Sequence, residues 1–134
     1  MISAMTAAIA NPAPVSVRFG QGGVIFREGE RATVAYLVIE GVVRPHTRDA
    51  DQLRFIGDVT AGGFFGEIAL LNDETYPISA VAATDVRLAV VRPEAFARQV
   101  EASPPLVRAT MRRLLSIVKR LKAAHAGSLE QLVK

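Results

Sequence analysis

Short hydrophobic segments separated by glycine and acidic turns dominate the chain between residues 23 and 91. The segments are rich in Val, Ile and aromatic residues, which favour β-strands. Strands are therefore expected at residues 23–26, 34–44, 52–59, 78–83 and 86–91. Gly29, Gly41 and Gly57 punctuate them, because glycine tolerates the positive φ angles of tight corners. No stretch long enough for a crossover helix separates the segments, so an antiparallel roll, barrel or sandwich is predicted rather than a parallel sheet.

The hydrophobic pattern changes to a helical period at Pro93. Pro93 and Glu94 suit the first turn of a helix. Ser103 suits the N-cap of a second, longer helix, and Gly127 suits its end. Five apolar residues recur along this second helix at alternating steps of four and three: Val107, Met111, Leu114, Val118 and Leu121. Such spacing places them on one stripe, which predicts a helix that packs against the roll or against a second copy.

Length and composition agree with a single globular domain. The 134 residues are half hydrophobic and 22% charged, which suits one domain over residues 1–134 with its own core. Within it the β-roll is expected at about residues 20–92 and the helices at about 93–126. The predicted class is therefore mainly β with C-terminal helices.

The side chains offer little for catalysis or metal binding. The chain contains no cysteine, which excludes disulfides, thiolate nucleophiles and cysteine-ligated zinc. Its two histidines, His46 and His125, form no cluster with carboxylates at metal-ligand spacing, so no metal site is expected. Neither accompanies a nucleophile motif such as Gly-x-Ser-x-Gly, so no catalytic residue is assigned and the chain is not expected to be an enzyme.

The net charge of +3 is distributed unevenly. Residues 1–102 hold nine arginines and twelve acidic residues, whereas residues 103–134 hold seven Lys and Arg against one acid. Arginines on one helix face are more often a solvated surface than a DNA contact, so specific nucleic-acid binding is not expected. No apolar run approaches the roughly 18 residues that cross a bilayer, and the N-terminal stretch lacks the basic start of a secretory signal. A cytoplasmic location without membrane contact is therefore expected.

The stretch GGFFGEIALLNDETYPISA, residues 62–80, carries the candidate chemistry. Its Gly66-Glu67 turn precedes a one- or two-turn helix, which would direct the amides of Glu67, Ile68 and Ala69 to one point. Such a helix start attracts phosphate, and small residues leave room for a ligand. A Gly-Glu pair has little packing value at a buried corner, which favours a functional role for both. Five apolar neighbours are expected to belong to the core: Phe64, Phe65, Ile68, Leu70 and Leu71.

This stretch resembles the phosphate-binding cassette of the cyclic-nucleotide-binding domain family, found in bacterial transcription regulators, kinase regulatory subunits and gated channels. FREGE followed by AYLVIEGVVR resembles the first hairpin region of that family. The resemblance, from about Gly20 to Leu121, implies an antiparallel, jelly-roll-like β-roll with a short cassette helix and a long C-terminal helix. It also implies a role for Glu67 in accepting hydrogen bonds from a ribose hydroxyl. The ligand-binding residues that it implies are Gly66, Glu67, Ile68, Ala69, Ser79 and Ala80.

The chain departs from the family pattern at Ile78. There the family has an arginine before Ser/Thr-Ala, and that arginine clamps the cyclic phosphate. A charge-assisted hydrogen bond contributes roughly 1.5–3 kcal/mol, so weak or absent binding of cAMP or cGMP is expected. Two alternatives are a site for a less anionic ligand and a vestigial pocket whose phosphate space Tyr76-Pro77 fills. A substitute clamp is the remaining alternative, with candidates Arg44, Arg54, Arg87, Arg112 and Arg113.

The leading interpretation is a non-catalytic regulatory or sensor domain in signal transduction, with weak or altered ligand binding and no cofactor. The alternatives are a dimerisation module with a vestigial pocket and a transcription regulator of the same family without its DNA-binding domain. The family's DNA readers carry a helix-turn-helix domain after the long helix, whereas nine residues follow His125 here. The long helix is expected to pair with its counterpart in a homodimer, unless it covers its own roll.

Overall fold

The protein is described here by a computed structural model that places residues 15–49, 52–71 and 74–133. The elements are β1 (Ser16–Phe19), β2 (Val24–Phe26), β3 (Ala35–Glu40), β4 (Val43–Asp49), β5 (Gln52–Phe55), β6 (Phe64–Phe65), the 3-10 helix η1 (Glu67–Leu71), β7 (Ser79–Ala82), β8 (Val86–Val91), α2 (Pro93–Ala102) and α3 (Pro105–Val133). Two compact units divide the chain within α2, between Phe96 and Ala97.

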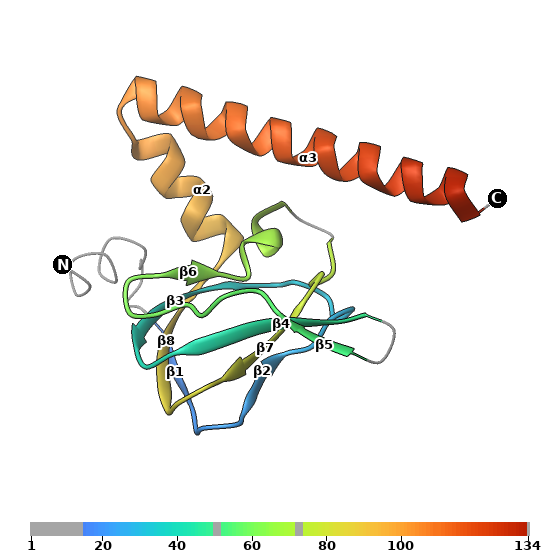
Figure 1. Cartoon of the computed structure of the whole chain (residues 1–134). Coiled ribbons are helices and arrows are strands. Elements are labelled where there is room, and N and C mark those ends of the chain that lie inside the picture. Colours follow the sequence, from blue (N-terminus) through green and yellow to red (C-terminus); the bar gives the residue numbers. More distant parts are fainter. Residues whose placement is uncertain (1–14, 50–51, 72–73, 134) are drawn as a thin grey trace. The chain divides into compact units, whose positions relative to one another are not determined.

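The strands form two four-stranded antiparallel sheets in the first unit (Figure 1). The first sheet has the order β1-β8-β3-β6, and the second has the order β2-β7-β4-β5. Most neighbouring strands come from distant parts of the sequence, as when β2 pairs with β7, whereas β4 and β5 are consecutive. The predicted mainly β class with an antiparallel roll and C-terminal helices is confirmed, and the sheets do not close into a barrel.

Gly41 is the point where the chain passes from the first sheet to the second. The sequence predicted one strand over residues 34–44, but β3 ends at Glu40 and β4 begins at Val43. Gly41 has a φ of 92°, and a Cβ atom there would lie 2.2 Å from the carbonyl oxygen of Asp85. Only glycine fits this corner, because both the backbone conformation and the space exclude a side chain.

Two strands escaped the prediction from sequence. β1 precedes the first predicted segment and pairs with β8, with Ser16 opposite Ala89. β6 has only two residues and pairs with β3, with Phe65 opposite Tyr36. Short strands such as these give too few residues for a period-2 pattern, so pairing with a long neighbour decides their conformation.

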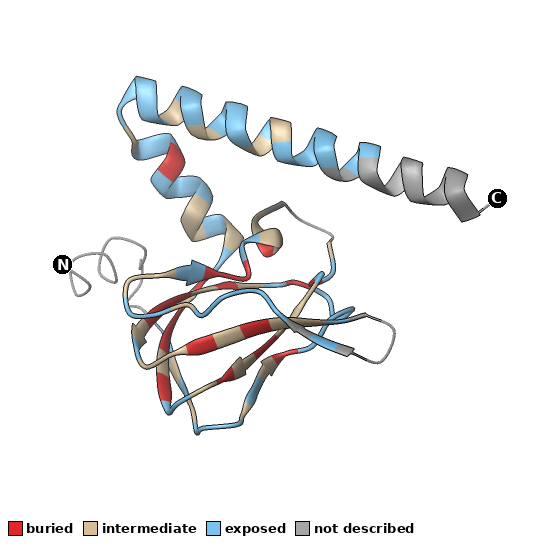
Figure 2. Cartoon of the chain, in the orientation of Figure 1, coloured by how far each residue is buried: buried red, intermediate tan, exposed pale blue. Residues whose placement is uncertain are grey.

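The main core lies between the two sheets (Figure 2). The second sheet contributes Phe26 and Val43, which are 3% and 0% exposed. The first sheet contributes the fully buried Val38 and Leu88 to the same cluster. A smaller cluster forms with residues of β3 and β8 that alternate with these, and Phe96 of α2 packs against it. The first sheet is therefore covered on both faces, which accounts for the nearly continuous hydrophobic sequence of β8.

The second unit contains the remainder of α2 and the whole of α3. The sequence predicted Ser103 as the N-cap of the long helix, but its hydroxyl donates to the Gln99 carbonyl of α2 over 2.7 Å. Arg108 donates to the carbonyl oxygen of Glu101 over 3.1 Å, so an α3 side chain satisfies the C-terminal end of α2. α3 continues through Gly127 to Val133, and the predicted stop at Gly127 is wrong.

Candidate functional site

Gly66 stands at the centre of the predicted cassette, between β6 and η1. It is buried and has a φ of 73°, a left-handed conformation that L side chains rarely adopt. A Cβ atom on Gly66 would lie 3.3 Å from Phe26 Cε2 and 3.6 Å from Tyr76 Cε1. Glycine is therefore favoured here by its backbone conformation and by the close approach of the Phe26 ring, whereas the distance to Tyr76 is ordinary van der Waals contact.

The short helix after Gly66 differs from the prediction in one respect. η1 is a 3-10 helix, and the Ala69 amide donates to the Gly66 carbonyl over 3.1 Å. The Ala69 amide, one of the three expected to point toward a ligand, therefore already has an acceptor in the chain. Ala69 is 1% exposed and Ile68 packs against the main core, whereas Glu67 is exposed.

The apolar neighbours of the cassette are only partly in the core. Phe65 is 4% exposed and belongs to the main core, and Leu70 packs against the smaller cluster. Phe64 is 40% exposed, so its predicted place in the core is wrong. The two phenylalanines are consecutive in β6, and consecutive side chains of a strand point to opposite faces. The side chain of Leu71 lies outside the described residues.

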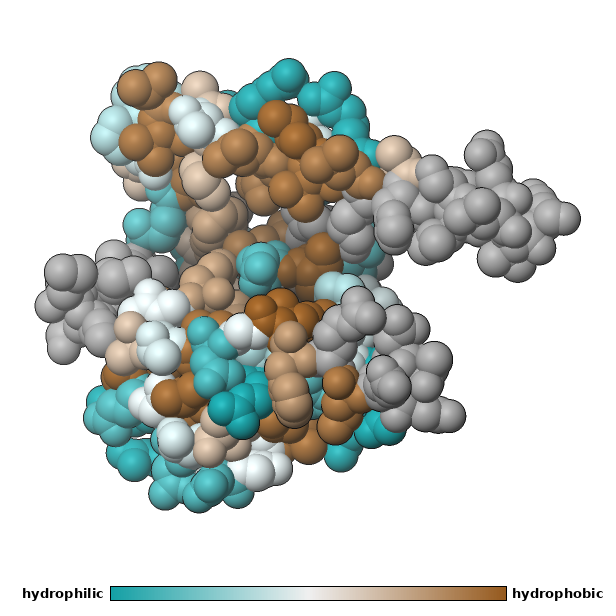
Figure 3. Space-filling model, viewed as in Figure 1, coloured by the Kyte–Doolittle hydropathy of each residue, from teal (hydrophilic) through white to brown (hydrophobic). Residues whose placement is uncertain are grey.

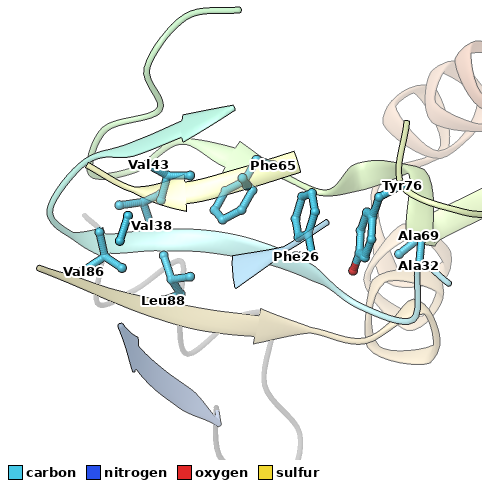
Figure 4. Packing of buried hydrophobic residues seen from close by; sticks show 11 residues of the cluster. Phe26, Ala32, Val38, Val43, Phe65, Ala69, Tyr76, Val86 and Leu88 are labelled. Atoms are coloured by element: carbon cyan, nitrogen blue, oxygen red, sulfur yellow. The ribbon is translucent and has the colours of Figure 1, made fainter. Parts of the chain in front are cut away.

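Tyr76 is the residue from the following loop that lies against Gly66. Its ring stacks on Phe26 with 3.7 Å between ring centroids and 8° between ring planes (Figure 4). The side chain is buried, and its hydroxyl donates to the Val34 carbonyl over 2.6 Å. Burial, followed by the nearby Tyr36, raises the pKa of Tyr76 to about 12. The hydroxyl is therefore protonated at neutral pH and carries no charge.

Backbone hydrogen bonds fix the Tyr76 loop to the turn before β3. The Tyr76 amide donates to the Glu30 carbonyl, and the Gly29 amide donates to the Tyr76 carbonyl, each over 2.9 Å. The Ala32 amide donates to the Glu74 carbonyl over 2.9 Å as well. This turn contains the FREGE sequence, which the resemblance placed in the first hairpin region. The two stretches that resembled the family are therefore joined side by side.

The residues after the loop point in different directions. Ile78 is partly buried and packs against the main core, and the following Ala80 is fully buried there. The Ser79 hydroxyl accepts a hydrogen bond from the Glu28 amide over 2.9 Å and lines the opposite face of the strand. Adjacent residues of a strand alternate between faces, so the side chains of Ser79 and Ala80 do not converge on one ligand. The place of Ile78 in the family pattern stays a prediction.

A groove on the outer face of the second sheet was not predicted. It has a volume of about 780 Å³ and is lined by Val24, Arg27, Glu28, Gly29, His46, Arg48, Ser79 and Val81. His46 also meets Phe55 edge-to-face, with 6.4 Å between ring centroids. The lining residues come from β2 and the turn that follows it, from β4 and from β7. These segments are far apart in sequence, so no local motif indicates the groove.

Three of the proposed substitute arginines already have acidic partners. Arg44 forms two hydrogen bonds with Asp58, at 2.9 and 3.1 Å, and this pairing lowers the pKa of the Asp58 carboxyl. Arg87 pairs with Glu40 at 2.9 Å. Arg112 of α3 forms an ion pair with Glu101 of α2.

These pairs leave fewer candidates for a substitute clamp. A carboxylate partner takes up some of the N–H donors of the guanidinium and offsets part of the positive charge that it could offer to a phosphate. Arg113 is exposed on α3, and the Arg54 side chain lies outside the described residues.

Two further observations concern metals and membranes. Among the residues that the structure describes, no group of three His, Asp or Glu side chains gathers in a way that could hold a metal ion. Within the same part of the chain, no helix combines the length and apolar character that crossing a membrane requires.

The sequence matches the model of a known protein family. Residues 16–103, from β1 to the end of α2, match the cyclic nucleotide-binding domain family. The chain belongs to this family. The match contains both sheets, the cassette and the turn that holds Tyr76. The family predicted from GGFFGEIALLND is therefore confirmed.

Curated proteins similar to this cyclic nucleotide-binding domain include kinase regulatory subunits. The cAMP-dependent protein kinase regulatory subunit of Hypocrea atroviridis is 33% identical over 93 residues, which cover 69% of this chain and 19% of that protein. The corresponding subunit of Colletotrichum orbiculare is 35% identical over 81 residues, which cover 60% of this chain and 20% of that protein. The chain spans about a fifth of the length of these relatives.

Solved structures with the same domain extend the comparison. EAL enzyme Bd1971 in a half-site-occupied form has a TM-score of 0.76 and 29% identity, and covers 82% of this chain and 99% of that chain. Its cGMP-bound form has a TM-score of 0.67 and 30% identity, and the match covers 88% of this chain and 31% of that chain. The catabolite activator protein of Thermus thermophilus has a TM-score of 0.69 and 25% identity, and the match covers 96% of this chain and 59% of that chain.

Proposed function

We propose that this chain is a non-catalytic regulatory domain that keeps the cyclic nucleotide-binding roll but binds cyclic nucleotides weakly. The observation that carries the proposal is the neutral, buried Tyr76 ring beside Gly66. A cyclic phosphate needs donors and a counter-charge at its binding site, and a protonated phenol in an aromatic stack supplies no counter-charge. The turn amides of the cassette are also partly used, since Ala69 donates to Gly66.

The regulatory part of the proposal rests on the relatives. The kinase subunits named above are regulatory, and the catabolite activator protein and the EAL enzyme carry the same roll in longer chains. This chain would act in the same general way, by presenting the roll and its helices to a partner. We assign no catalytic step to any of its residues, and no cofactor beyond a possible cyclic nucleotide.

Homodimerisation through α3 is the second part of the proposal. Val107, Leu114 and Val118 are 48%, 51% and 43% exposed in the single chain, although all three are apolar. Figure 3 shows hydrophobic side chains gathered on the described part of α3. A two-fold helix pair is the commonest way to bury such a stripe. The ion pair of Arg112 with Glu101 reduces the positive charge that two facing helices would bring together.

Titration calorimetry with cAMP and with cGMP tests the proposed weak binding. We expect a dissociation constant above about 1 μM, which corresponds to a binding free energy weaker than roughly 8 kcal/mol. A tighter constant would contradict weak binding and would direct attention to an arginine that replaces the clamp. Because each titration uses the free nucleotide and the whole chain, the result does not depend on which residue closes the site.

A further inference from the structure

Small residues surround one side of the cassette, and a single aromatic ring takes the space that they leave. Gly66 has no side chain, and the nearby Ala32 and Ala69 are 5% and 1% exposed. Figure 4 shows the Tyr76 ring between Phe26 and these two alanines. Tyr76 Cε1 would lie 3.6 Å from a Cβ atom on Gly66, which is ordinary van der Waals contact. The ring therefore fills the room that glycine and alanine would otherwise leave to a ligand.

Both the ring and the hydroxyl of Tyr76 have a partner within the protein. The ring stacks on Phe26 at 3.7 Å, and the hydroxyl donates to the Val34 carbonyl over 2.6 Å. Its backbone is fixed at both the amide and the carbonyl by Glu30 and Gly29. Moving the ring into solvent would break the stack and remove the Tyr76 hydroxyl as donor to the partly buried Val34 carbonyl. A weakly bound ligand could not compensate for both losses.

We infer that Tyr76 is the resident occupant of the cassette and the residue that determines which ligands the site excludes. The inference rests on the proposed function in one respect, that the cassette is the ligand site. Tyr76 excludes a cyclic nucleotide by volume, because its ring takes the space, and by charge, because its hydroxyl is neutral. The roll is thereby packed without a ligand. The molecule that matches the occupied space is a neutral phenol the size of a tyrosine side chain.

Removing the Tyr76 side chain by mutation and adding a small phenol of the same shape tests this occupancy. Tyr76→Ala should lower the Tm, and millimolar 4-methylphenol should raise the Tm of this variant by at least about 3 °C while leaving the wild type unchanged. Phe64→Ala is the matched control, since it removes an aromatic ring of β6 that is already 40% exposed. A folded Tyr76→Ala protein that 4-methylphenol does not stabilise would overturn the inference.

A second measurement uses proteins that keep the ring and so does not depend on whether Tyr76→Ala folds. The chain has two tyrosines, so Tyr36→Phe leaves Tyr76 as the single source of tyrosine ring signals in an NMR spectrum. Stacking on Phe26 should shift these signals upfield, and Phe26→Leu in the same background should reverse that shift. Signals at the positions of an exposed tyrosine would overturn the inference.

Adding cAMP to this Tyr36→Phe protein separates the inference from the proposed function. Unchanged Tyr76 signals at millimolar cAMP support the occupancy. Tyr76 signals that move on saturation with cAMP overturn the occupancy, whatever the dissociation constant. Submicromolar binding with unchanged Tyr76 signals would contradict the proposed weak binding but would leave the occupancy supported, with the nucleotide bound elsewhere.

Discussion

The rings of Tyr76 and Phe26 lie face to face, 3.7 Å apart between centroids, and both approach the cassette residue Gly66. Phe26 ends β2 and Tyr76 precedes β7, and these two strands are neighbours in the second sheet. Strand pairing therefore brings the two residues together across fifty positions of sequence. The stack therefore joins β2 to the loop that lies beside Gly66.

Substitutions at Tyr76 should separate the ring from its hydroxyl. Tyr76→Phe keeps the stack and loses the hydrogen bond to Val34, and we expect a loss of about 1–2 kcal/mol in the free energy of unfolding. Tyr76→Ala also removes the ring and should cost about 3–5 kcal/mol. Urea denaturation measures both values. Equal effects of the two substitutions would mean that the ring contributes nothing beyond its hydroxyl.

The raised pKa of Tyr76 predicts a loss of stability in alkali. The folded-state pKa of about 12 lies above the ordinary value of 10.0, so the folded protein retains a proton that the unfolded chain loses. Stability from this group is complete below pH 10 and falls as the pH rises from 10 to 12, by up to about 1.4 kcal/mol per pH unit. Urea denaturation at pH 9 and pH 11 should show a smaller decrease for Tyr76→Phe than for the wild type.

Two arginine substitutions should distinguish missing charge from missing space. Ile78→Arg supplies the arginine that the resemblance predicts before Ser-Ala, but Ile78 packs against the main core, so the change should destabilise the fold. Tyr76→Arg removes the ring and brings a guanidinium beside Gly66. We expect Tyr76→Arg to bind cAMP at least about tenfold more tightly than the wild type, a difference of about 1.4 kcal/mol. Titration calorimetry with cAMP on both variants distinguishes the two causes. Stronger binding by Ile78→Arg alone would indicate that the missing charge at position 78 weakens binding.

Alanine at two glycines should separate backbone strain from crowding. Gly62 and Gly66 both have positive φ angles, 88° and 73°. A Cβ atom on Gly62 would meet nothing within 4 Å, whereas one on Gly66 would lie 3.3 Å from Phe26. Gly66→Ala should therefore lower the free energy of unfolding by about 1 kcal/mol or more beyond the loss caused by Gly62→Ala. Similar losses would indicate that the rings near Gly66 yield to a methyl group.

A charge in the apolar stripe of α3 should abolish dimerisation. Leu114 is 51% exposed in the single chain, and Leu114→Glu should give a folded monomer in sedimentation at micromolar concentration. Ser116→Glu is the matched control, because Ser116 is exposed on the same helix and lies off the stripe. Salt screens repulsion between the basic residues over about 10 Å at 0.1 M, so the dimer should persist near physiological ionic strength. A monomeric wild type would contradict the expected helix pair.

The sequence predicted those parts of the fold that depend on long local patterns. β3, β8 and α3 have enough apolar residues at a regular period to identify their type, and the GEIALL motif marked the short helix. It did not predict β6, because pairing with β3 rather than its own two residues makes it a strand. The same register sends Phe65 into the main core and leaves Phe64 exposed.

The candidate site was harder to predict than the fold. The GEIALL motif identified Gly66, and filling by Tyr76-Pro77 was one of several alternatives, but neither indicated a direction for the Tyr76 side chain. That direction depends on Phe26 and on the Glu30 and Val34 carbonyls, which belong to another part of the chain. Predicting such an arrangement requires knowing which strands pair, and a single sequence does not contain that information locally.

The joint between α2 and α3 has a mechanical consequence. Arg108 holds the carbonyl end of α2, and Arg112 adds an ion pair with Glu101, so three groups on two successive helices resist bending between them. A helix of 29 residues at 1.5 Å per residue measures about 44 Å. If the joint stays stiff, a rotation of about 10° in α2 carries the far end of α3 through about 8 Å, so α3 is a lever that magnifies small tilts at its base.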